Sequence, residues 1–521
     1  MRLHKLIRFV TPLVILAVLM IGAAVPVAAG SVTVAPLMLV SGPSPFASCT
    51  IGATGTPGET LYVNAEEEPW VDVNPTNPNN LIAVWQQDRW SNGGAHGLAT
   101  GVSHDGGATW SITYPHFSIC AGGTAANGGD YERSSDPWVS FSPDGTAYQI
   151  SLSVSFSVGV QGLNAVLVSK STDGGMHWSE PVTLKRDSGD RDSSYAFNDK
   201  ESITADPTDS HYAYAVWDRF VTPAGTSMAS LAGFFDSRSF RQPAWFARTT
   251  DGGQTWEPAR KIFDPSEFNG TIGNQIVVLP NGDLVNVFDF FLLNSNRHGL
   301  RGASVAVIRS TDKGETWSRA IIVAKDLGQG ARDPDTERPI RAEGGIPEVA
   351  VDRNNGNMYV VWQDTRFSGV DEIALSMSTN GGRTWSAPIK VSQTPRSSVA
   401  LNQQAFVPNV RVADDGTVAV TYYDFRNNDA SPGVPTDYWI VHCHAGTADC
   451  SQAENWGAEA RLSPASFDIE QAPAARGPFG YFLGEYEGLT STGNTFRPVF
   501  VQVNNGNGSN RTDVFATTVS P

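Results

Sequence analysis

Ser103-His104-Asp105-Gly106-Gly107-Ala108-Thr109-Trp110 is the first of five copies of one eight-residue phrase. The later copies occupy residues 171–178, 249–256, 310–317 and 378–385, and each keeps a Ser or Thr first, an Asp or Asn third and a Trp last. Successive copies begin 68, 78, 61 and 68 residues apart. Because so regular a spacing marks an array of one supersecondary unit, the sequence predicts a repeat architecture.

The chemistry of the phrase is that of a tight turn between two antiparallel strands. Its Asp or Asn can accept hydrogen bonds from backbone N–H groups two or three residues further on, and its glycines supply positive φ at no steric cost. The Trp can fill the space between neighbouring sheets. We therefore expect structural roles for the third positions, which are Asp105, Asp173, Asp251, Asp312 and Asn380.

The phrase resembles the Asp-box, or BNR, repeat of sialidases and related β-propellers, and the resemblance covers roughly residues 60–521. It implies that each copy lies in the turn between the third and fourth strands of a four-stranded blade. It also implies that this turn is on the face opposite the active site. The five copies therefore indicate the scaffold, and the chemistry is expected elsewhere.

The rest of the chain has the composition of an all-β protein, with 51 Gly, 32 Pro and short β-branched or aromatic runs between turns. Two further repeats without the phrase follow the fifth copy, beginning near Pro408 and Gly484. We predict a β-propeller of four-stranded blades, with seven blades favoured and six, as in sialidases, as the alternative. The last repeat has room for three strands, so an N-terminal strand near Leu61 would close the ring.

The N-terminus has the features of an export signal. Arg2, Lys5 and Arg8 precede an apolar stretch from Phe9 to about Val25, and small residues allow cleavage before residue 30. Retention of this stretch as a membrane anchor is the alternative. We predict a signal peptide at 1–29, a linker or N-terminal segment at 30–58 and one propeller domain at 59–521, in a secreted, extracellular protein without stable membrane insertion.

The charge of the chain excludes some partners. Its formal net charge is −17, and removal of residues 1–29 takes away three positive charges and no negative ones, leaving −20. Nucleic acid and anionic membrane surfaces both require a basic face, so neither is an expected partner. A glycan or glycoconjugate is the expected ligand, and an acidic sugar would need a local basic pocket. The sequence does not indicate the oligomeric state.

Four cysteines in an exported chain favour two disulfides. Cys443 and Cys450 are seven residues apart and could close a local loop, which leaves Cys49 to pair with Cys120. Four cysteines allow three pairings, so the other two stay open at this point. A metal cluster of His442, Cys443, His444 and Cys450 is a further alternative, which the oxidising context disfavours.

The face opposite the repeated phrase collects the residues before each first strand and after each second strand, and these are rich in carboxylates, arginines and tyrosines. In the sialidase family a Tyr backed by a Glu attacks the sugar, an Asp acts as acid and base, and three arginines bind the sugar carboxylate. By position, the catalytic candidates are Tyr486, Glu485, Glu487, Asp199 and Glu201. The substrate-binding candidates are Arg219, Arg366, Arg426, Lys200 and Glu343.

Two observations argue against a direct transfer of the sialidase mechanism. The family's Arg-Ile-Pro motif is missing, and Arg338-Pro339-Ile340 has the same residue types in another order. In addition, an Asp followed by an Arg recurs after the second strand of at least four repeats, and repetition favours a structural pair that braces adjacent blades.

Two functions therefore stand side by side. The first is a secreted sialidase-like exo-glycosidase that hydrolyses terminal acidic sugars, and the second is a non-catalytic propeller that binds glycan or protein at the same face. A hydrolase acting on another glycan is a third hypothesis. No cofactor or metal site is expected, although a ring of carboxylates offers the oxygen ligands that a structural calcium ion prefers.

Overall fold

Strands make up nearly all of the regular structure, as the composition predicted, and the remainder consists of short 3-10 helices and turns. The computed structural model describes residues 32–156, 163–187, 196–221, 241–292, 302–342, 346–457, 459–475 and 480–521, and all structural statements concern these residues. The predicted signal peptide lies outside them. Within them, no helix is long and apolar enough to cross a membrane.

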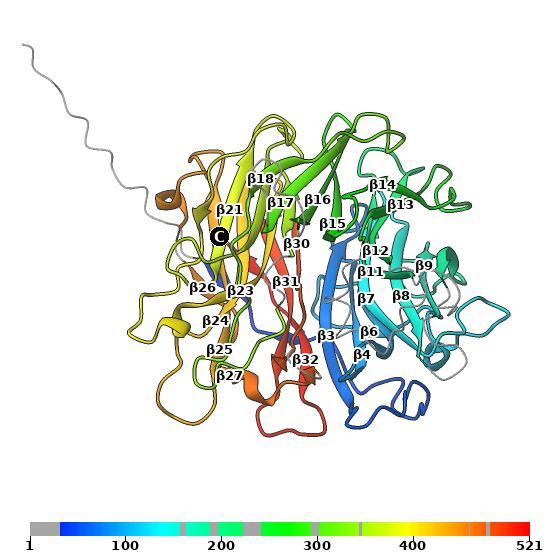
Figure 1. Ribbon diagram of the computed structural model, residues 1–521, viewed down its shortest axis with the longest axis horizontal. Coiled ribbons are helices and arrows are strands. Elements are labelled where there is room, and N and C mark those ends of the chain that lie inside the picture. Colours follow the sequence, from blue (N-terminus) through cyan, green and yellow to red (C-terminus); the bar gives the residue numbers. More distant parts are fainter. Residues whose placement is uncertain are drawn as a thin grey trace, which may run out of the picture. The chain divides into compact units, whose positions relative to one another are not determined.

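The described chain from residue 61 to residue 461 forms six successive groups of four strands, each strand antiparallel to the next. Each group begins with the strand named first here (Figure 1). The first two groups are β3 (Leu61–Val73), β4 (Leu81–Trp90), β5 (Ala95–Ser103) and β6 (Ser111–Thr113), then β7 (Arg133–Phe141), β8 (Ala147–Ser155), β9 (Leu163–Ser171) and β10 (Val182–Asp187). The next two are β11 (Ala196–Ala205), β12 (Ala213–Val221), β13 (Ala244–Thr249) and β14 (Arg260–Phe263), then β15 (Asn269–Val278), β16 (Leu284–Leu292), β17 (Gly302–Ser310) and β18 (Ile321–Lys325). The last two are β19 (Glu348–Val351), β20 (Met358–Asp364), β21 (Glu372–Ser378) and β22 (Ile389–Lys390), then β23 (Ala405–Val412), β24 (Thr417–Asp424), β25 (Pro435–His444) and β26 (Ala460–Arg461).

A seventh group closes the chain with β30 (Gly488–Thr492), β31 (Thr495–Val503) and β32 (Thr512–Ala516). Two short strands of the N-terminal segment join it: β2 (Met38–Leu39) pairs with β32, and β1 (Thr33–Val34) pairs with β33 (Val519–Ser520). The segment predicted as a linker therefore contains strands. Leu61 instead begins β3, which continues through a register shift at Asn64 and pairs with β4 on both sides of it. β3 pairs with β32 only at Ala65 and Thr512.

The first strands of the seven groups contact one another in sequence order. β3 contacts β7, β7 contacts β11, and the series continues through β15, β19, β23 and β30. β30 in turn contacts β3, so the order of contacts returns to its starting point. In Figure 1 the labels β30, β31 and β32 lie beside β3, although these strands come from opposite ends of the sequence.

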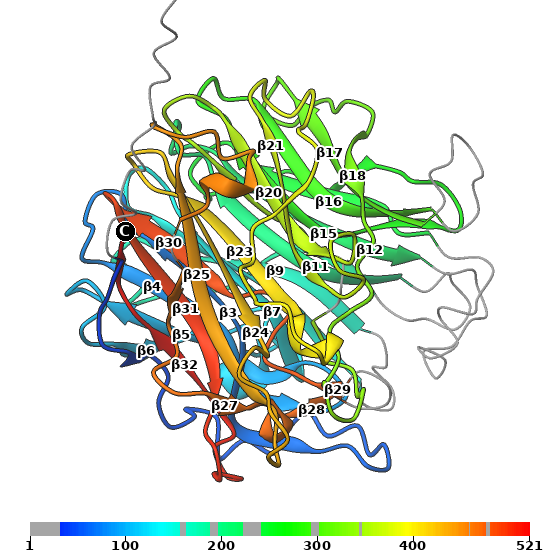
Figure 2. The same ribbon diagram turned by 90° about the vertical axis from the view of Figure 1, so that its left-hand side faces the viewer.

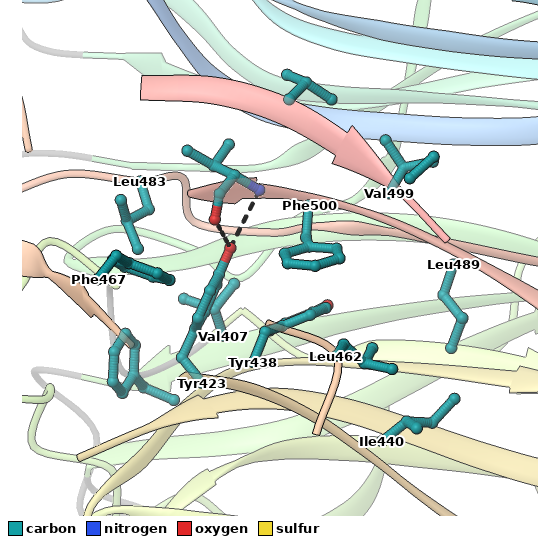
Figure 3. Packing of buried hydrophobic residues seen from close by; sticks show 14 of the residues in the cluster. Val407, Tyr423, Tyr438, Ile440, Leu462, Phe467, Leu483, Leu489, Val499 and Phe500 are labelled. Atoms are coloured by element: carbon teal, nitrogen blue, oxygen red, sulfur yellow. Dashed lines mark hydrogen bonds between the residues drawn. The ribbon is translucent and has the colours of Figure 1, made fainter. Parts of the chain in front are cut away.

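The core fills the space between neighbouring groups. Trp85, Trp217 and Trp362 occupy the second strands of three groups and are fully buried. Figure 3 shows one such contact, in which Tyr423 of β24 reaches β31 and its hydroxyl donates to Val501 O at 2.7 Å while accepting from Val501 N at 3.1 Å. Burial of large apolar side chains on both faces of a sheet is the main stabilising term for such an arrangement.

All five copies of the repeated phrase form the same hydrogen-bonded turn. In the first copy, Ser103 Oγ donates to Asp105 Oδ1 at 2.9 Å, and the same oxygen accepts from Thr109 N at 2.9 Å. This N–H is four residues after the Asp, and in the third copy Asp251 Oδ1 also accepts from Gln254 N, three residues on, at 3.0 Å, as the sequence predicted. In the fifth copy, Asn380 Oδ1 accepts from Thr384 N at 2.9 Å, so the neutral amide supports the turn as well.

The second glycine of a phrase lies against the preceding group. A Cβ atom on Gly175 would stand 2.7 Å from Ile82 Cδ1, and its φ is +97°. A side chain at this position would therefore meet both a clash and backbone strain. Gly106 N–H also donates to Asn79 O at 2.9 Å, which sets the phrase beside the turn that joins the first and second strands. The opposite ends of the first strands are thus left for the candidate site.

Both predicted disulfides are present. Cys49 and Cys120 are bonded, with their Cα atoms 5.6 Å apart, and tie the N-terminal segment to the loop between β6 and β7. Cys443 and Cys450 are bonded across seven residues at the end of β25. Because Cys443 and Cys450 form a disulfide, neither offers a thiolate to a metal ion, and the alternative of a Cys–His metal cluster at residues 442–450 is wrong.

Candidate functional site

The first strands share an unusual backbone feature near the end that points away from the repeated phrases. Glu68, Asp136 and Lys200 have φ values of +54°, +53° and +46°. Each lies at a break in the strand register, and Gly273 and Val407 occupy the corresponding bulges of β15 and β23. Non-glycine residues with positive φ are strained, and such strain concentrates at functional sites. The three charged residues therefore mark the region to examine.

Glu68, Asp136 and Glu485 form a cluster of carboxyl groups at this end of the first strands. Glu68 is 1% exposed and Asp136 is 6% exposed. Burial raises the pKa of Glu68, and the charges of Asp136 and Glu485 raise it further. Burial likewise raises the pKa of Asp136, to which Asp199 and Glu485 add. Carboxyl groups in such surroundings retain a proton at pH values where an exposed carboxyl group has lost it.

Two arginines and one lysine balance part of this negative charge. Arg341 Nε donates to Glu485 Oε1 at 2.7 Å, and Arg89 Nε lies 3.2 Å from Glu67 Oε2. Both guanidinium groups stack on the ring of Phe482, at 4.6 Å for Arg341 and 4.8 Å for Arg89. Lys200 is nearly buried, and its ammonium lies 3.7 Å from the centre of the Tyr486 ring.

Two chain segments pass over the cluster. Glu68 N–H donates to Leu483 O at 3.2 Å, and a Cβ atom on Gly484 would stand 2.9 Å from Glu68 N. The second segment is joined to the first, because Arg341 N–H donates to Tyr481 O at 2.8 Å. The short strands β28 (Ala474–Ala475) and β29 (Gly480–Tyr481) belong to the same covering layer. Together these segments keep the carboxyl groups largely out of contact with bulk water.

Tyr486, the predicted nucleophile, is fully buried. Its ring lies edge-on to Trp70, with 6.2 Å between ring centres, and its hydroxyl donates to Pro137 O at 3.3 Å. Glu487 is also fully buried, and its carboxyl oxygens lie 3.0 Å from Tyr423 OH and 3.1 Å from Val501 N, within the same polar network. The contacts of both residues are those of packing and of a polar core network.

The other predicted acids lie beside the cluster. Glu201 is fully buried, and neither of its carboxyl oxygens has a hydrogen-bond partner among the described residues. Burial raises the pKa of Glu201, and the charge of Asp136 raises it further. Asp199 is half-buried and pairs with Asp218 in the strand register. Of the five catalytic candidates, Glu485 has its carboxylate within the cluster, and Glu201 and Asp199 act on Asp136 electrostatically.

The three predicted arginines do not converge. Arg219 NH2 lies 2.6 Å from Asp187, Arg366 NH2 lies 2.7 Å from Asp364, and Arg426 is bonded to both Asp424 and Glu459. Each arginine belongs to a different group of strands. Arg219 and Asp187 come from neighbouring groups, whereas Arg366 and Arg426 pair with Asp364 and Asp424 of their own groups. The predicted bracing of adjacent repeats is therefore wrong for the ion pairs of Arg366 and Arg426. Glu343, the remaining candidate, lies outside the described residues.

Several residues of the cluster were not chosen from the sequence. Glu68-Pro69-Trp70 and Asp136-Pro137-Trp138 repeat an acidic residue before Pro-Trp at the same point of two repeats. That recurrence is a signal in the sequence that could have been followed. Arg341 and Phe482 belong to segments that no repeat predicts, and the sequence contains no comparable signal for them.

The chain was compared with known proteins. No family model matches it. A xyloglucanase from Paenibacillus sp is 28% identical over 206 residues, which are 38% of this chain and 17% of that protein, so the match spans less than a fifth of the relative. Among solved structures, a Hadza microbial sialidase has a TM-score of 0.44 and 16% identity, with 85% of this chain and 74% of that chain covered. An alpha-L-arabinanase of Penicillium chrysogenum complexed with arabinobiose has a TM-score of 0.44 and 14% identity, with 75% and 94% covered.

Proposed function

We propose that this chain is a secreted glycoside hydrolase in which Glu68, Asp136 and Glu485 provide the acid and base groups. The observation that carries the proposal is the meeting of these three carboxyl groups in two different environments. Glu68 and Asp136 are buried with raised pKa values, whereas Glu485 is paired with Arg341. Two carboxyl groups whose surroundings favour opposite protonation states are the basis of glycosidic bond hydrolysis.

The chemistry assigns a different task to each environment. A protonated Glu68 or Asp136 would donate its proton to the oxygen of the leaving sugar. An ionised Glu485, held by Arg341, would either activate a water molecule or attack the anomeric carbon. The guanidinium groups of Arg89 and Arg341 stack on the ring of Phe482. The ring is therefore positioned to exclude water from the ion pairs that these arginines form with Glu67 and Glu485.

The proposal departs from the sialidase mechanism on one point. The Tyr486 ring packs against Trp70 and Trp138, its hydroxyl donates to Pro137 O at 3.3 Å, and burial raises its pKa, so this phenol is a poor nucleophile. We therefore assign the chemistry to the carboxyl groups. Two substrates remain to be compared: a terminal acidic sugar, which the Asp-box resemblance suggests, and xyloglucan, which the partial similarity to a xyloglucanase suggests.

For the scaffold we propose a seven-bladed propeller. Support comes from the seven first strands, whose contacts return from β30 to β3. The N-terminal strand β2 would complete the last blade, since it pairs with β32 at Met38 and Ala516. The two disulfides are compatible with the proposed export of the protein.

A non-catalytic glycan- or protein-binding propeller is the second candidate. The observation in its favour is the cover over the carboxyl groups, in which Leu483 O accepts directly from Glu68 N–H. In that case Glu68 and Asp136 would serve only to hold the covering segments in place.

The deciding experiment measures hydrolysis by the full mature chain of a fluorogenic α-sialoside and of xyloglucan, between about pH 4 and 8. We expect turnover of at least one substrate, and a loss of about 10²-fold or more in kcat for Glu68→Gln or Asp136→Asn. Glu267→Gln, a change at an exposed carboxylate far along the chain, is the matched control. Folded wild-type protein that binds these glycans without turnover would replace the hydrolase with the binding propeller.

A further inference from the structure

The seven first strands line a cavity of about 130 Å³ at the end where the repeated phrases lie. The part of the cavity lining that lies nearest to the carboxyl cluster is formed by Trp70 and Trp138. Their rings stack with centres 3.4 Å apart. From there the lining runs along apolar side chains such as Ile276 and Val349 to the turns of the opposite face. The stacked tryptophans set this cavity apart from the proposed catalytic site.

Three charged side chains line the cavity: Asp72, Arg353 and Arg411. Arg411 belongs to β23 and is half-buried, between Val410 and Val412, which face the core. Arg353 follows β19 by two residues and is exposed. Among the described residues, neither guanidinium group has a hydrogen-bond or ion-pair partner. A half-buried guanidinium group without a protein partner has lost part of its hydration without compensation, so Arg411 in particular requires an explanation.

Arg411 has a second guanidinium group, Arg353, among the charges that act on it. Burial lowers the pKa of the Arg411 guanidinium, Arg353 lowers it further, and the opposing influences of Asp72 and Asp414 are smaller. Asp72 is also committed to the backbone, because its carboxylate accepts from Val73 N at 2.9 Å and from Phe141 N at 2.8 Å. Arg353 follows β19 and Arg411 lies on the neighbouring strand β23, and their N–H donors have no acceptor among the described residues, so an added anion would satisfy both.

We propose that Arg353 and Arg411 bind a small oxyanion, such as phosphate, sulfate or a carboxylate, at the mouth of this cavity. A guanidinium group presents a planar fork of N–H donors that matches the oxygens of such anions. The volume is several times the roughly 10–15 Å³ that a single water requires, so an anion of a few atoms can enter with water. The site does not depend on the proposed hydrolase activity.

The test uses the full mature chain and titrates it with inorganic phosphate, sodium sulfate or sodium acetate, at ionic strength held constant with sodium chloride. We expect about 10 mM phosphate to raise Tm by a few degrees relative to chloride alone. Acetate tests whether one carboxylate suffices, and a response equal to that of phosphate would show that the site accepts a carboxylate as well as a phosphate. Isothermal titration calorimetry of phosphate gives the affinity directly.

Two variants identify the site. Arg411→Gln and Arg353→Gln should each weaken phosphate binding by about tenfold or more. Arg319→Gln, at an exposed arginine two residues after the phrase of the fourth group, should leave it unchanged. Because Arg353 is exposed, its variant is expected to fold even where Arg411→Gln does not. No Tm shift with any oxyanion, or a shift of equal size in both site variants, would overturn the proposal.

Discussion

Arg341 and Glu485 are separated by 144 residues in the sequence and are joined by a hydrogen bond of 2.7 Å from Nε to Oε1. The pair links the segment before the fifth group of strands to the segment before the seventh. The Arg341–Glu485 pair lies over Glu68, so it joins the two chain segments that cover the candidate site to the carboxyl groups beneath them. Several consequences of this arrangement can be measured.

The first prediction concerns Arg341 itself and rests on the proposed hydrolase. Arg341→Gln removes the charge that holds the Glu485 carboxylate, so kcat should fall by about 10- to 100-fold with a smaller change in KM. Arg341→Lys should restore part of the loss. Arg338→Gln is the control, because Arg338 is exposed and stacks on Tyr481 instead. An unchanged kcat in Arg341→Gln would remove the pair from the mechanism.

The second prediction concerns the pH dependence of stability. Burial raises the pKa of Glu348 to about 7. A carboxyl group with a raised folded-state pKa contributes stability that is present below its unfolded pKa and is lost as the pH rises through the folded pKa. Glu348→Gln should therefore gain up to about 3 kcal/mol relative to wild type between pH 5 and pH 8.

Gln275 allows this substitution, because its amide Nε2, 3.2 Å from Glu348 Oε2, can donate equally well to a glutamine oxygen. Chemical denaturation at several pH values gives the free energies of unfolding. The exposed Glu267→Gln should show a flat difference from wild type over the same range. If the Glu348→Gln difference were also flat, Glu348 would not be the group responsible.

The third prediction concerns the repeated turn. Asp312 accepts from Ser310 Oγ at 2.7 Å and from Thr316 N at 2.9 Å, so Asp312→Ala should cost about 1–3 kcal/mol of unfolding free energy at neutral pH. Asp312→Asn should cost less, since Asn380 makes the equivalent bonds in the fifth copy. Urea unfolding measures both. Equal losses in the two variants would mean that the charge, and not the bonding pattern, supports the turn.

Acid should reveal the difference between these two residues. The hydrogen bond from the Thr316 side chain, together with that from its backbone N–H, lowers the pKa of Asp312 to about 2. The contribution of Asp312 is therefore present above its unfolded pKa near 3.8 and is lost as the pH falls through about 2. Asp312→Asn should lack this acid-dependent loss.

The fourth prediction compares the two disulfides. Cys49 and Cys120 close a separation of 71 residues, and Cys443 and Cys450 close one of seven. Because a longer loop loses more entropy when it is closed, the Cys49→Ser/Cys120→Ser double variant should lose roughly 4 kcal/mol and the Cys443→Ser/Cys450→Ser variant roughly 2 kcal/mol. Thermal unfolding of both variants tests the order. A larger loss from the short loop would show that native-state contacts, rather than chain entropy, dominate.

The repeated turn and the all-β fold could be predicted because both depend on local chemistry. An Asp, two glycines and a Trp at fixed spacing form the same turn wherever they occur, and their recurrence predicted the groups of strands. The disulfides were predictable because one pair is close in sequence. The strand near Leu61, predicted to close the ring, is instead the start of β3, and the two-residue strand β2 could not be predicted because so short a segment has no pattern of its own.

The candidate site depended on contacts between distant segments. The sequence placed Tyr486 among acidic residues, but whether it faced a substrate or the core was decided by Trp70 and Trp138 packing around it. Composition likewise cannot distinguish Arg219, which is paired with Asp187, from Arg411, which lines a cavity and has no partner within the described part of the chain. By itself the sequence determined the repeated unit, because local backbone preferences set it. Only the tertiary structure decided which acids and bases share a buried environment, because burial and pairing depend on which strands and covering segments meet.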